Sequence, residues 1–299
     1  MFYGVITPFI TPFKKDFSID FKAVELLAKH QIEHGVHGIF PNSTTGEFVH
    51  LKPDEAVELT RHVIDAVGGK AWVIPGISGN CTEHCIELGR RMIDLGIDGV
   101  VVTPPFFFKP GLSKLEKHFS SIADKLDTNI IVYNIPATTG ICIPVKLYVK
   151  LAIEHSNIVA AKVTMDSIDY MRRLILDVKS VRRDFSVLTG VDAMLLPVLM
   201  MGGDGGIMAL ANILPQIHRE VYDSFVNGDL SAAVRAWRRL LMLSKVYDTA
   251  SSFPTAVKAL ARALGMPIEL VSRPPLDSEP TEVVNKIRSI VLEVDLHLF

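Results

Sequence analysis

The stretch NIVAAKVTMDS, residues 157–167, is apolar for most of its length and places one lysine, Lys162, near its middle. Ala160, Ala161 and Val163 surround this lysine, so both alternating faces of the run are mainly apolar. A strand that is apolar on both faces is typical of a parallel sheet covered by helices. Because a lysine is rarely fully buried without a partner or a task, the role of Lys162 depends on the fold around it.

The composition is that of a folded globular protein. The chain has 299 residues, of which 48% are hydrophobic and 21% charged, and this length is enough to bury a large core. The formal net charge of -2 gives nucleic acid no basic surface to bind. We therefore expect no nucleic-acid partner.

No segment has the pattern of a membrane span or a signal peptide. The most apolar region, residues 185–217, is interrupted by Asp192, Asp204, two prolines and a glycine cluster. The N-terminal MFYGVITPF has no basic segment ahead of an apolar run. We therefore expect a protein that neither enters the membrane nor is secreted.

The cysteines and histidines do not have the spacing of a metal site. Cys81, Cys85 and Cys142 are odd in number and far from the spacing of a zinc site, which favours a reduced, cytoplasmic compartment. His34 and His37 lack a third ligand in register. We predict that no metal is bound.

Short apolar runs alternate with longer amphipathic segments along most of the chain. The runs that we predict to be strands are 3–7, 38–40, 72–76, 99–103, 130–134, 158–163, 186–190 and 205–210. Eight strand–helix units predict an α/β fold, a (β/α)8 TIM barrel, over residues 1–214. The first strand is not followed by G-x-G-x-x-G, so we reject a dinucleotide-binding fold.

The remaining residues, 215–299, have only helical periodicity. The predicted helices are 217–228, 229–248, 253–265 and 279–294. No linker separates them from the barrel, so we predict a C-terminal helical extension that belongs to the same structural unit.

In a barrel of this type, catalytic side chains stand at the carboxyl ends of the strands. The polar and glycine residues at the predicted strand ends are Thr7, Ser43, Thr44, Thr45, Gly46, Glu47, Thr103, Tyr133, Lys162, Gly190 and Asp192. This set contains one lysine and one tyrosine on neighbouring strands, and it contains no histidine.

Each of these residues has a structural and a functional interpretation. Lys162 is either a rim lysine or a desolvated amine that attacks a ketone to form a Schiff base. Tyr133 is either a core tyrosine or a proton shuttle for imine chemistry. Thr44 and Thr45 belong to a turn or helix cap that is equally able to bind a carboxylate. The glycine run at 202–206 is more consistent with a tight turn than with a phosphate site, because Asp204 would repel an anion.

Taken together, these motifs resemble the N-acetylneuraminate lyase/dihydrodipicolinate synthase family of class I aldolases over nearly the full length. The matching segments are GVITPF (4–9), STTGE (43–47), GVVVTPP (99–105), YNIPATTG (133–140), AAKVT (160–164), GVD (190–192) and GGDGGI (202–207). The resemblance implies a Schiff-base lyase that needs no metal and no diffusible cofactor.

The resemblance also implies a role for each matching residue. Lys162 forms the imine with pyruvate or another 2-oxo acid, and Tyr133 is the proton shuttle. Thr44 and Thr45 bind the carboxylate, with Thr44 also in the proton relay. Further substrate contacts are expected from Thr164, Gly190, Asp192 and Ile207.

Four positions depart from relatives with known substrates. Thr138 replaces an arginine, and Phe107 a tyrosine, that dihydrodipicolinate synthases usually carry. Ala193 and Ala209 replace polar residues that sialate lyases use to bind hydroxyl groups. We therefore predict cleavage of a shorter 2-keto-3-deoxy sugar acid, such as 2-keto-3-deoxygluconate, to pyruvate and an aldehyde.

Three alternatives stay open at this point. The first is a dihydrodipicolinate synthase that condenses pyruvate with aspartate semialdehyde without the usual arginine. The second is a hydratase-aldolase or dehydratase of the same family, with Phe106, Phe107, Phe108, Ala193 and Ala209 lining an apolar pocket. The third is a binding protein without catalytic activity, which the presence of Lys162, Tyr133 and Thr44 argues against.

The segment PPFFFKP, residues 104–110, predicts a homo-oligomer, either a dimer or a tetramer. Three consecutive phenylalanines after the fourth strand would otherwise form an exposed apolar patch. The alternative is that two of the rings turn inward and line the pocket.

Overall fold

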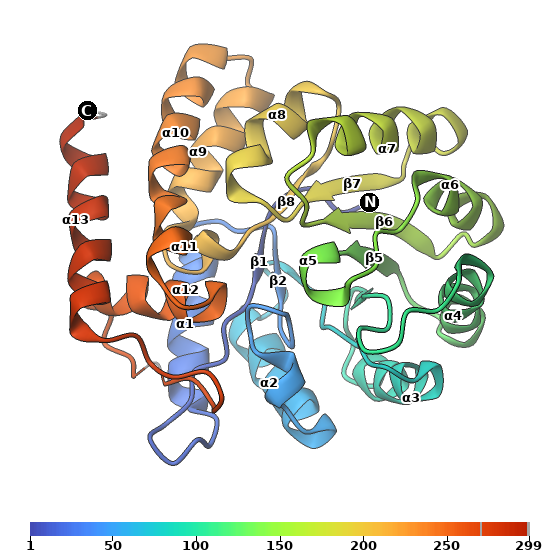
Figure 1. Ribbon diagram of the computed structural model, residues 1–299, viewed down its shortest axis with the longest axis horizontal. Coiled ribbons are helices and arrows are strands. Elements are labelled where there is room, and N and C mark those ends of the chain that lie inside the picture. Colours follow the sequence, from blue (N-terminus) through green and yellow to red (C-terminus); the bar gives the residue numbers. More distant parts are fainter. Residues whose placement is uncertain (270, 298–299) are drawn as a thin grey trace.

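The computed structural model describes residues 1–269 and 271–297, with the side chains of 295–297 left out of the description. It contains one eight-stranded parallel sheet, which lies among the surrounding helices in Figure 1. The strands are β1 (Gly4–Pro8), β2 (Gly38–Phe40), β3 (Trp72–Val73), β4 (Val100–Val102), β5 (Ile130–Asn134), β6 (Ile158–Val163), β7 (Ser186–Thr189) and β8 (Gly205–Ile207).

The sheet closes on itself and forms a barrel. The strand order is β3-β2-β1-β8-β7-β6-β5-β4, so β1 pairs with β8. The last gap, between β3 and β4, is bridged just beyond β3, where Gly76 pairs in parallel with Val101. Ile77 N donates to Val101 O at 2.9 Å and Val101 N donates to Pro75 O at 3.0 Å. The predicted (β/α)8 barrel is therefore confirmed.

Side chains on each strand alternate between the barrel interior and the helices outside. On β6, Ala160 packs with the interior cluster, whereas Ala161 and Val163 pack with the outer core. Lys162 therefore points inward, on the same face as Ala160. Its register partner on β5 is Tyr133, which packs with the interior cluster as well.

The helices follow the strands and surround the barrel (Figure 1). After the strands come α1 (Phe21–Glu33), α2 (Pro53–Val67), α3 (Thr82–Ile93), α4 (Leu112–Lys125), α5 (Pro136–Thr139), α6 (Val145–Glu154), α7 (Ile168–Val181), α8 (Leu195–Met200) and α9 (Pro215–Val226). Toward the C-terminus follow α10 (Leu230–Leu243), α11 (Lys245–Thr249), α12 (Phe253–Ala263) and α13 (Thr281–His297).

Local sequence signals explain where several helices begin and end. Asp20, Ser167 and Asp229 are N-caps whose side chains accept a hydrogen bond from the backbone three residues on. Gly68 ends α2 in the left-handed conformation, with φ of 57°, which glycine adopts without steric cost.

Some predicted elements differ from the observed ones. The predicted strand 72–76 ends at Val73, since Pro75 has no N–H to donate to a neighbouring strand. The predicted strand 205–210 ends at Ile207, and a 3-10 turn at Ala209–Asn212 follows it. The single predicted helix 229–248 is broken at Ser244 into α10 and α11.

The C-terminal helices pack directly on the barrel. Helix α9 contacts β1, α8 and α10, and α10 contacts α13. Trp237 Nε1, on α10, donates to the carbonyl oxygen of Ala193 at 2.7 Å. The division into 1–214 and 215–299 stays a prediction, because α9 packs against both parts.

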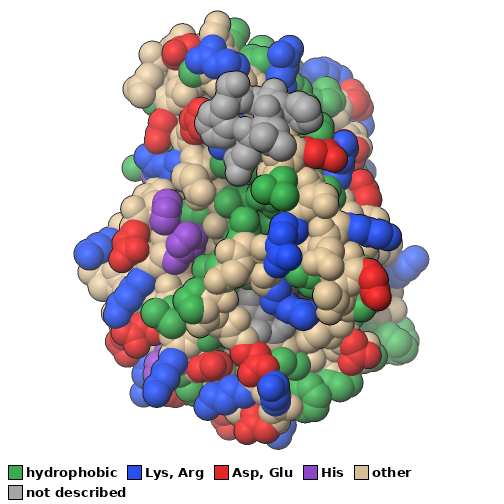
Figure 2. Space-filling view, turned by 90° about the vertical axis from the view of Figure 1, so that its left-hand side faces the viewer, with side chains coloured by type: hydrophobic (Ala, Val, Ile, Leu, Met, Phe, Trp, Pro, Cys, Tyr) green, Lys and Arg blue, Asp and Glu red, His purple; other side chains and the backbone are tan. Residues whose placement is uncertain are grey.

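Within residues 1–269 and 271–297, no helix has the length and apolar character needed to cross a membrane. Figure 2 shows one face of the molecule, on the side of α13 in Figure 1, where basic and acidic side chains are interspersed.

Candidate active site

A cavity of about 220 Å³ lies at the carboxyl ends of the strands and contains the predicted nucleophile. Its lining residues are Pro8, Thr45, Tyr133, Ile135, Lys162, Thr164, Gly190, Val191, Asp192, Ala193, Ile207, Ala209, Ser244, Tyr247 and Phe253. We call it the inner cavity. It brings together Lys162, Tyr133, Thr45, Thr164, Gly190, Asp192 and Ile207, which are the predicted site residues other than Thr44.

Lys162 is a buried amine without an ion pair among the described residues. The residue is 3% exposed, and its Nζ lies 4.0 Å from the centre of the Tyr133 ring and 5.1 Å from that of Phe40. Burial lowers the pKa of Lys162 to about 7, although the negative charge of Asp192 opposes the shift. Near neutral pH, much of this amine is therefore unprotonated and nucleophilic.

Tyr133 holds its hydroxyl group next to two threonines. Tyr133 OH lies 3.0 Å from Thr164 Oγ1, and it also forms a side-chain hydrogen bond with Thr44. Burial raises the pKa of Tyr133 to about 12, and these two hydrogen bonds limit the rise. The phenol therefore keeps its proton at neutral pH and has a neighbouring hydroxyl with which to exchange it.

Gly190 is required by the close packing of this site. A Cβ at residue 190 would lie 1.9 Å from Thr164 Oγ1 and 3.1 Å from Lys162 Cε. Any larger residue would therefore displace Thr164 or Lys162. The predicted contact of Gly190 with the substrate stays a prediction, while its steric role follows from the packing.

The carboxylate of Asp192 is held by three protein donors. His218 Nε2 lies 2.7 Å from its Oδ1, Leu210 N donates to the same oxygen at 3.2 Å, and Tyr247 OH donates to Oδ2 at 2.8 Å. Asp192 is 2% exposed. These contacts fix an anion close enough to influence Lys162, and a direct contact of Asp192 with substrate stays a prediction.

A second cavity, of about 310 Å³, adjoins the first and shares Ile135 and Phe253 with it. Its lining residues are Thr44, Glu47, Phe48, Val49, His50, Thr103, Phe106, Ile135, Thr138, Thr139, Ser252, Phe253, Pro254, Pro275 and Leu276. We call it the outer cavity. It contains Thr44 and the two predicted positions Thr103 and Thr138.

Two predictions about residues near the site are wrong. Thr7 lies near the end of β1, but its side chain points away from the barrel interior. On the outer side, Thr7 Oγ1 donates to Gln31 Oε1 of α1 at 2.6 Å. Of the three phenylalanines, only Phe106 turns inward and packs edge-on against Phe48. Phe107 and Phe108 are 77% and 78% exposed, so they do not line the pocket.

Residues near the C-terminus line both cavities, which the sequence patterns did not predict. Ser244, Tyr247 and Phe253 line the inner cavity, and Pro275 and Leu276 line the outer one. Ser244, Tyr247 and Phe253 belong to predicted helices whose periodicity gives no sign that they reach the carboxyl ends of the strands. Pro275 and Leu276 lie in the segment between α12 and α13.

No group of three or more potential metal ligands occurs within the described residues. His37 instead accepts a hydrogen bond from Val5 N at 3.0 Å and lies against the guanidinium of Arg219. Burial lowers the pKa of His37 to about 4, with Arg219 as the second cause.

A buried lysine beside a tyrosine, at the carboxyl end of a closed parallel barrel, defines a class of carbon–carbon lyases and synthases. The chain belongs to the dihydrodipicolinate synthetase family, whose model matches residues 1–294. It is thus a lyase of the kind that its relatives represent.

Three relatives illustrate the range of this family. An uncharacterized DapA-like lyase of Thermofilum pendens is 61% identical over 99% of both chains. A probable 2-dehydro-3-deoxy-D-pentonate aldolase, YjhH of Escherichia coli, is 31% identical over 97% of this chain and 96% of its own. The crystal structure of YagE, an E. coli prophage protein of the dihydrodipicolinic acid synthase family in complex with pyruvate, superimposes with a TM-score of 0.97 at 30% identity over 99% of both chains.

Proposed function

We propose that this protein is a class I aldolase that cleaves a 2-keto-3-deoxy sugar acid to pyruvate and an aldehyde. The observation that carries the proposal is the buried amine of Lys162, with a pKa near 7, directly beside the phenol of Tyr133. The pyruvate complex of YagE, a structural neighbour over 99% of both chains, supports a 2-oxo acid as the ligand.

The reaction begins at Lys162. Its Nζ adds to the C2 carbonyl carbon of the substrate, and loss of water from the resulting carbinolamine gives an iminium ion. The C3–C4 bond then breaks, its electron pair moves into the iminium to form an enamine, and the C4 hydroxyl gives up its proton as the aldehyde leaves. Protonation of the enamine at C3 and hydrolysis return the lysine and release pyruvate.

Tyr133 is suited to move the protons in these steps. Its hydroxyl group lies next to Thr164 Oγ1 and is hydrogen-bonded to Thr44, so a proton can pass between substrate and the outer cavity. Thr44 and Thr45 belong to a turn that offers hydroxyl and backbone N–H groups to the substrate carboxylate. In this scheme no metal or diffusible cofactor takes part, and the reaction takes place in the cytoplasm.

The charge of the two cavities favours a neutral aldehyde. Among the described residues that line them, Lys162 is the only lysine or arginine. Thr138, at the position where synthases usually carry an arginine, lines the outer cavity with an uncharged hydroxyl. A substrate half with its own carboxylate, such as aspartate semialdehyde, would lack a cationic partner here. A sugar acid carries its single carboxylate at the imine end.

The apolar lining also supports a second candidate, a dehydratase or hydratase-aldolase that uses the same imine. Ala193 and Ala209 line the inner cavity, and Phe106 lines the outer one. The two reactions differ in their products, because a dehydratase releases water and keeps the carbon chain intact. An aldolase releases pyruvate from a sugar acid, a dihydrodipicolinate synthase takes up pyruvate with aspartate semialdehyde, and a dehydratase forms a dehydrated acid without releasing pyruvate. Assay of pyruvate release or uptake, together with the mass of the product, over a panel of sugar acids and aspartate semialdehyde separates all three reactions.

The proposal is tested by trapping the imine. Treatment with pyruvate and borohydride should reduce it to a stable secondary amine on Lys162, which intact-mass and peptide analysis detect. Lys258 is an internal control, because it is equally buried but paired with Glu47, and should remain unlabelled. An adduct that persists in Lys162→Ala would refute the proposal.

We also propose that the protein is a homo-oligomer in which Phe107 and Phe108 lie in a subunit contact. The two rings pack edge-on at 5.1 Å and are both largely exposed, which is unusual for neighbouring aromatic residues on a monomer. Light scattering should show a dimer or tetramer in the native protein and smaller species in Phe107→Ser/Phe108→Ser. A native monomer would contradict this.

A further inference from the structure

We propose that Lys258, on α12, is a positioning residue that holds the Thr44–Thr45 turn in place through a buried ion pair with Glu47. The inference rests on the proposed function, since it assigns Lys258 a role through the carboxylate-binding threonines. Lys258 itself lines neither cavity.

The turn that carries the two threonines has an unfavourable backbone. Asn42 and Glu47, which flank it, adopt positive φ values of 54° and 59°, which non-glycine residues seldom adopt. Residues in such conformations cost on the order of 1–3 kcal/mol each and persist only when their surroundings fix them. Gly46 between them is packed so closely that a Cβ would lie 2.5 Å from Phe9 O. The turn therefore needs support from outside.

One side of the turn is supported by the segment that follows β1. Ser43 Oγ donates to Phe9 O at 3.1 Å and accepts from Gly46 N at 3.0 Å. Thr11 Oγ1 donates to Gly46 O at 2.6 Å. These bonds fix the backbone around Gly46, but none of them reaches the side chain of Glu47.

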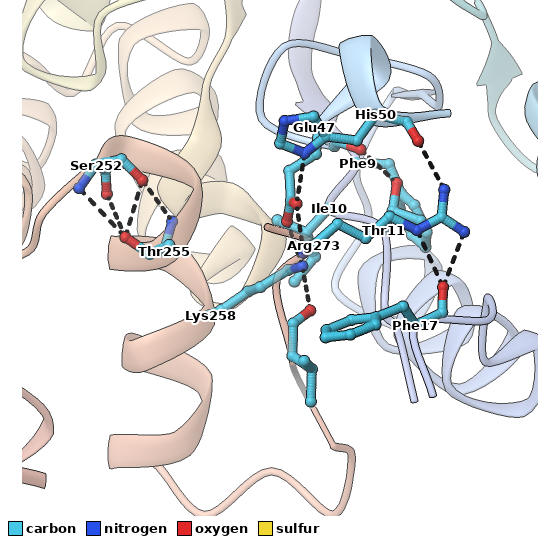
Figure 3. Close-up of polar contacts among 12 residues, drawn as sticks. Phe9, Ile10, Thr11, Phe17, Glu47, His50, Ser252, Thr255, Lys258 and Arg273 are labelled. Carbon is cyan, nitrogen blue, oxygen red and sulfur yellow. Dashed lines mark hydrogen bonds and ion pairs between the residues drawn. The ribbon is translucent and has the colours of Figure 1, made fainter. Parts of the chain in front are cut away.

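The other side is supported by the C-terminal helices, as Figure 3 shows. Lys258 Nζ pairs with Glu47 Oε1 and also donates to Val271 O at 2.7 Å. Glu47 Oε2 accepts from Arg273 N at 3.2 Å and lies 3.3 Å from His50 Nδ1. The carboxylate of a turn residue is thus held by donors from α12 and from the segment after it.

This ion pair is buried, and its burial argues for a role in orientation. The side chains of Lys258 and Glu47 are 3% and 0% exposed. Two charges taken out of water stabilise a fold no better than apolar residues of similar volume. The ion pair instead fixes an orientation, because Lys258 Nζ donates to only two acceptors, the Glu47 carboxylate and the Val271 carbonyl oxygen. The pair therefore fixes the distance between α12 and the turn.

The test compares Lys258→Met, Glu47→Gln and the double variant Glu47→Gln/Lys258→Met. Lys258→Met leaves a buried carboxylate unpaired, so we expect the turn to open and the half-saturating pyruvate concentration in borohydride trapping to rise at least tenfold. The double variant lacks both charges of the buried pair. Its half-saturating pyruvate concentration should therefore return at least halfway to the native value on a logarithmic scale. The trapping rate at saturating pyruvate should change much less than the half-saturating pyruvate concentration.

Glu55→Gln is the matched control. Glu55 pairs with Arg273 on the same C-terminal segment, but that pair lies outside the turn and is partly exposed. Its loss should lower the melting temperature slightly and leave the half-saturation within twofold of the native value. An effect of Lys258→Met that is merely structural would resemble this control.

Hydrogen–deuterium exchange of the peptide spanning residues 40–51 tests the same inference without any reaction. We expect this peptide to exchange faster in Lys258→Met than in Glu55→Gln. The measurement uses no substrate, so the expectation does not depend on pyruvate being the ligand. If Lys258→Met does not fold, the double variant takes its place, with an expected rise of about threefold, above the twofold limit set for Glu55→Gln. The proposal would be overturned if a folded Lys258→Met or double variant had the same half-saturating pyruvate concentration and the same exchange rate in residues 40–51 as the native protein. If the native protein itself formed no adduct with pyruvate and borohydride, the proposed function would be refuted instead.

Discussion

Two lysines of this protein are buried to the same extent but face different partners. Lys162 is 3% exposed and Lys258 is 2% exposed. Burial is the first cause that lowers the pKa of each, but Lys258 has the carboxylate of Glu47 in contact to oppose it. Lys162 has only the more distant charge of Asp192.

The comparison shows that burial alone does not make a lysine reactive. An ammonium that is paired with a carboxylate can hold two segments together. An unpaired one loses its proton near pH 7 and becomes a nucleophile. The two lysines differ in the side chain that faces each of them. The carboxylate of Glu47 faces Lys258, whereas the ring of Tyr133 faces Lys162.

The largest effect on catalysis, after loss of Lys162 itself, is expected from the residue that faces it. Tyr133→Phe removes the hydroxyl group and keeps the ring, so kcat should fall by about 10²–10⁴ while the fold is retained. Tyr148→Phe is the control, since Tyr148 is equally buried but donates to Val132 O outside the site. A loss of less than about threefold in Tyr133→Phe would count against the shuttle.

The two lysines should respond to the same substitution with opposite signs. Lys258→Met leaves Glu47 unpaired and should lower stability by about 3–5 kcal/mol. Lys162→Met removes an amine whose burial is unfavourable and should raise stability, by an amount on the order of a few kcal/mol. Melting temperatures at pH 7 measure both.

The pH dependence sharpens this contrast. The pKa of Lys162 is lower in the folded state than in the unfolded state, so the unfolded state binds more protons between about pH 7 and the ordinary range of lysine. Native stability from this group therefore rises with pH, and the advantage of Lys162→Met should shrink from pH 7 to pH 10. An advantage that grows with pH would contradict the assignment.

The smallest effect is expected from the distant anion. Because Asp192 raises the pKa of Lys162, Asp192→Asn should move the acid limb of the trapping rate toward lower pH. We expect the rate at a given pH to change by less than about tenfold, as for one charge at the edge of a site. Asp169→Asn, an exposed aspartate of α7, should leave the midpoint in place, and a shift toward higher pH would refute the role of Asp192.

The barrel and the pairing of Lys162 with Tyr133 could be predicted from the sequence. Apolar runs spaced by amphipathic segments are local patterns, and the period-2 alternation of β6 already places Lys162 on the same face as Ala160. The order of β5 and β6 in the chain makes Tyr133 and Lys162 neighbours, because consecutive strands of a parallel barrel pair with each other.

The contacts that residues near the C-terminus make in and around the site depend on long-range packing, so no local pattern predicts them. Tyr247, Phe253 and Lys258 lie far along the chain from β6, on helices whose periodicity shows an apolar face but not what that face contacts. Thr7 was misassigned for the same reason, since a strand end does not say toward which side its last side chain points. Contacts between distant segments depend on how helices dock, and docking is fixed by packing of the whole chain rather than by any local pattern.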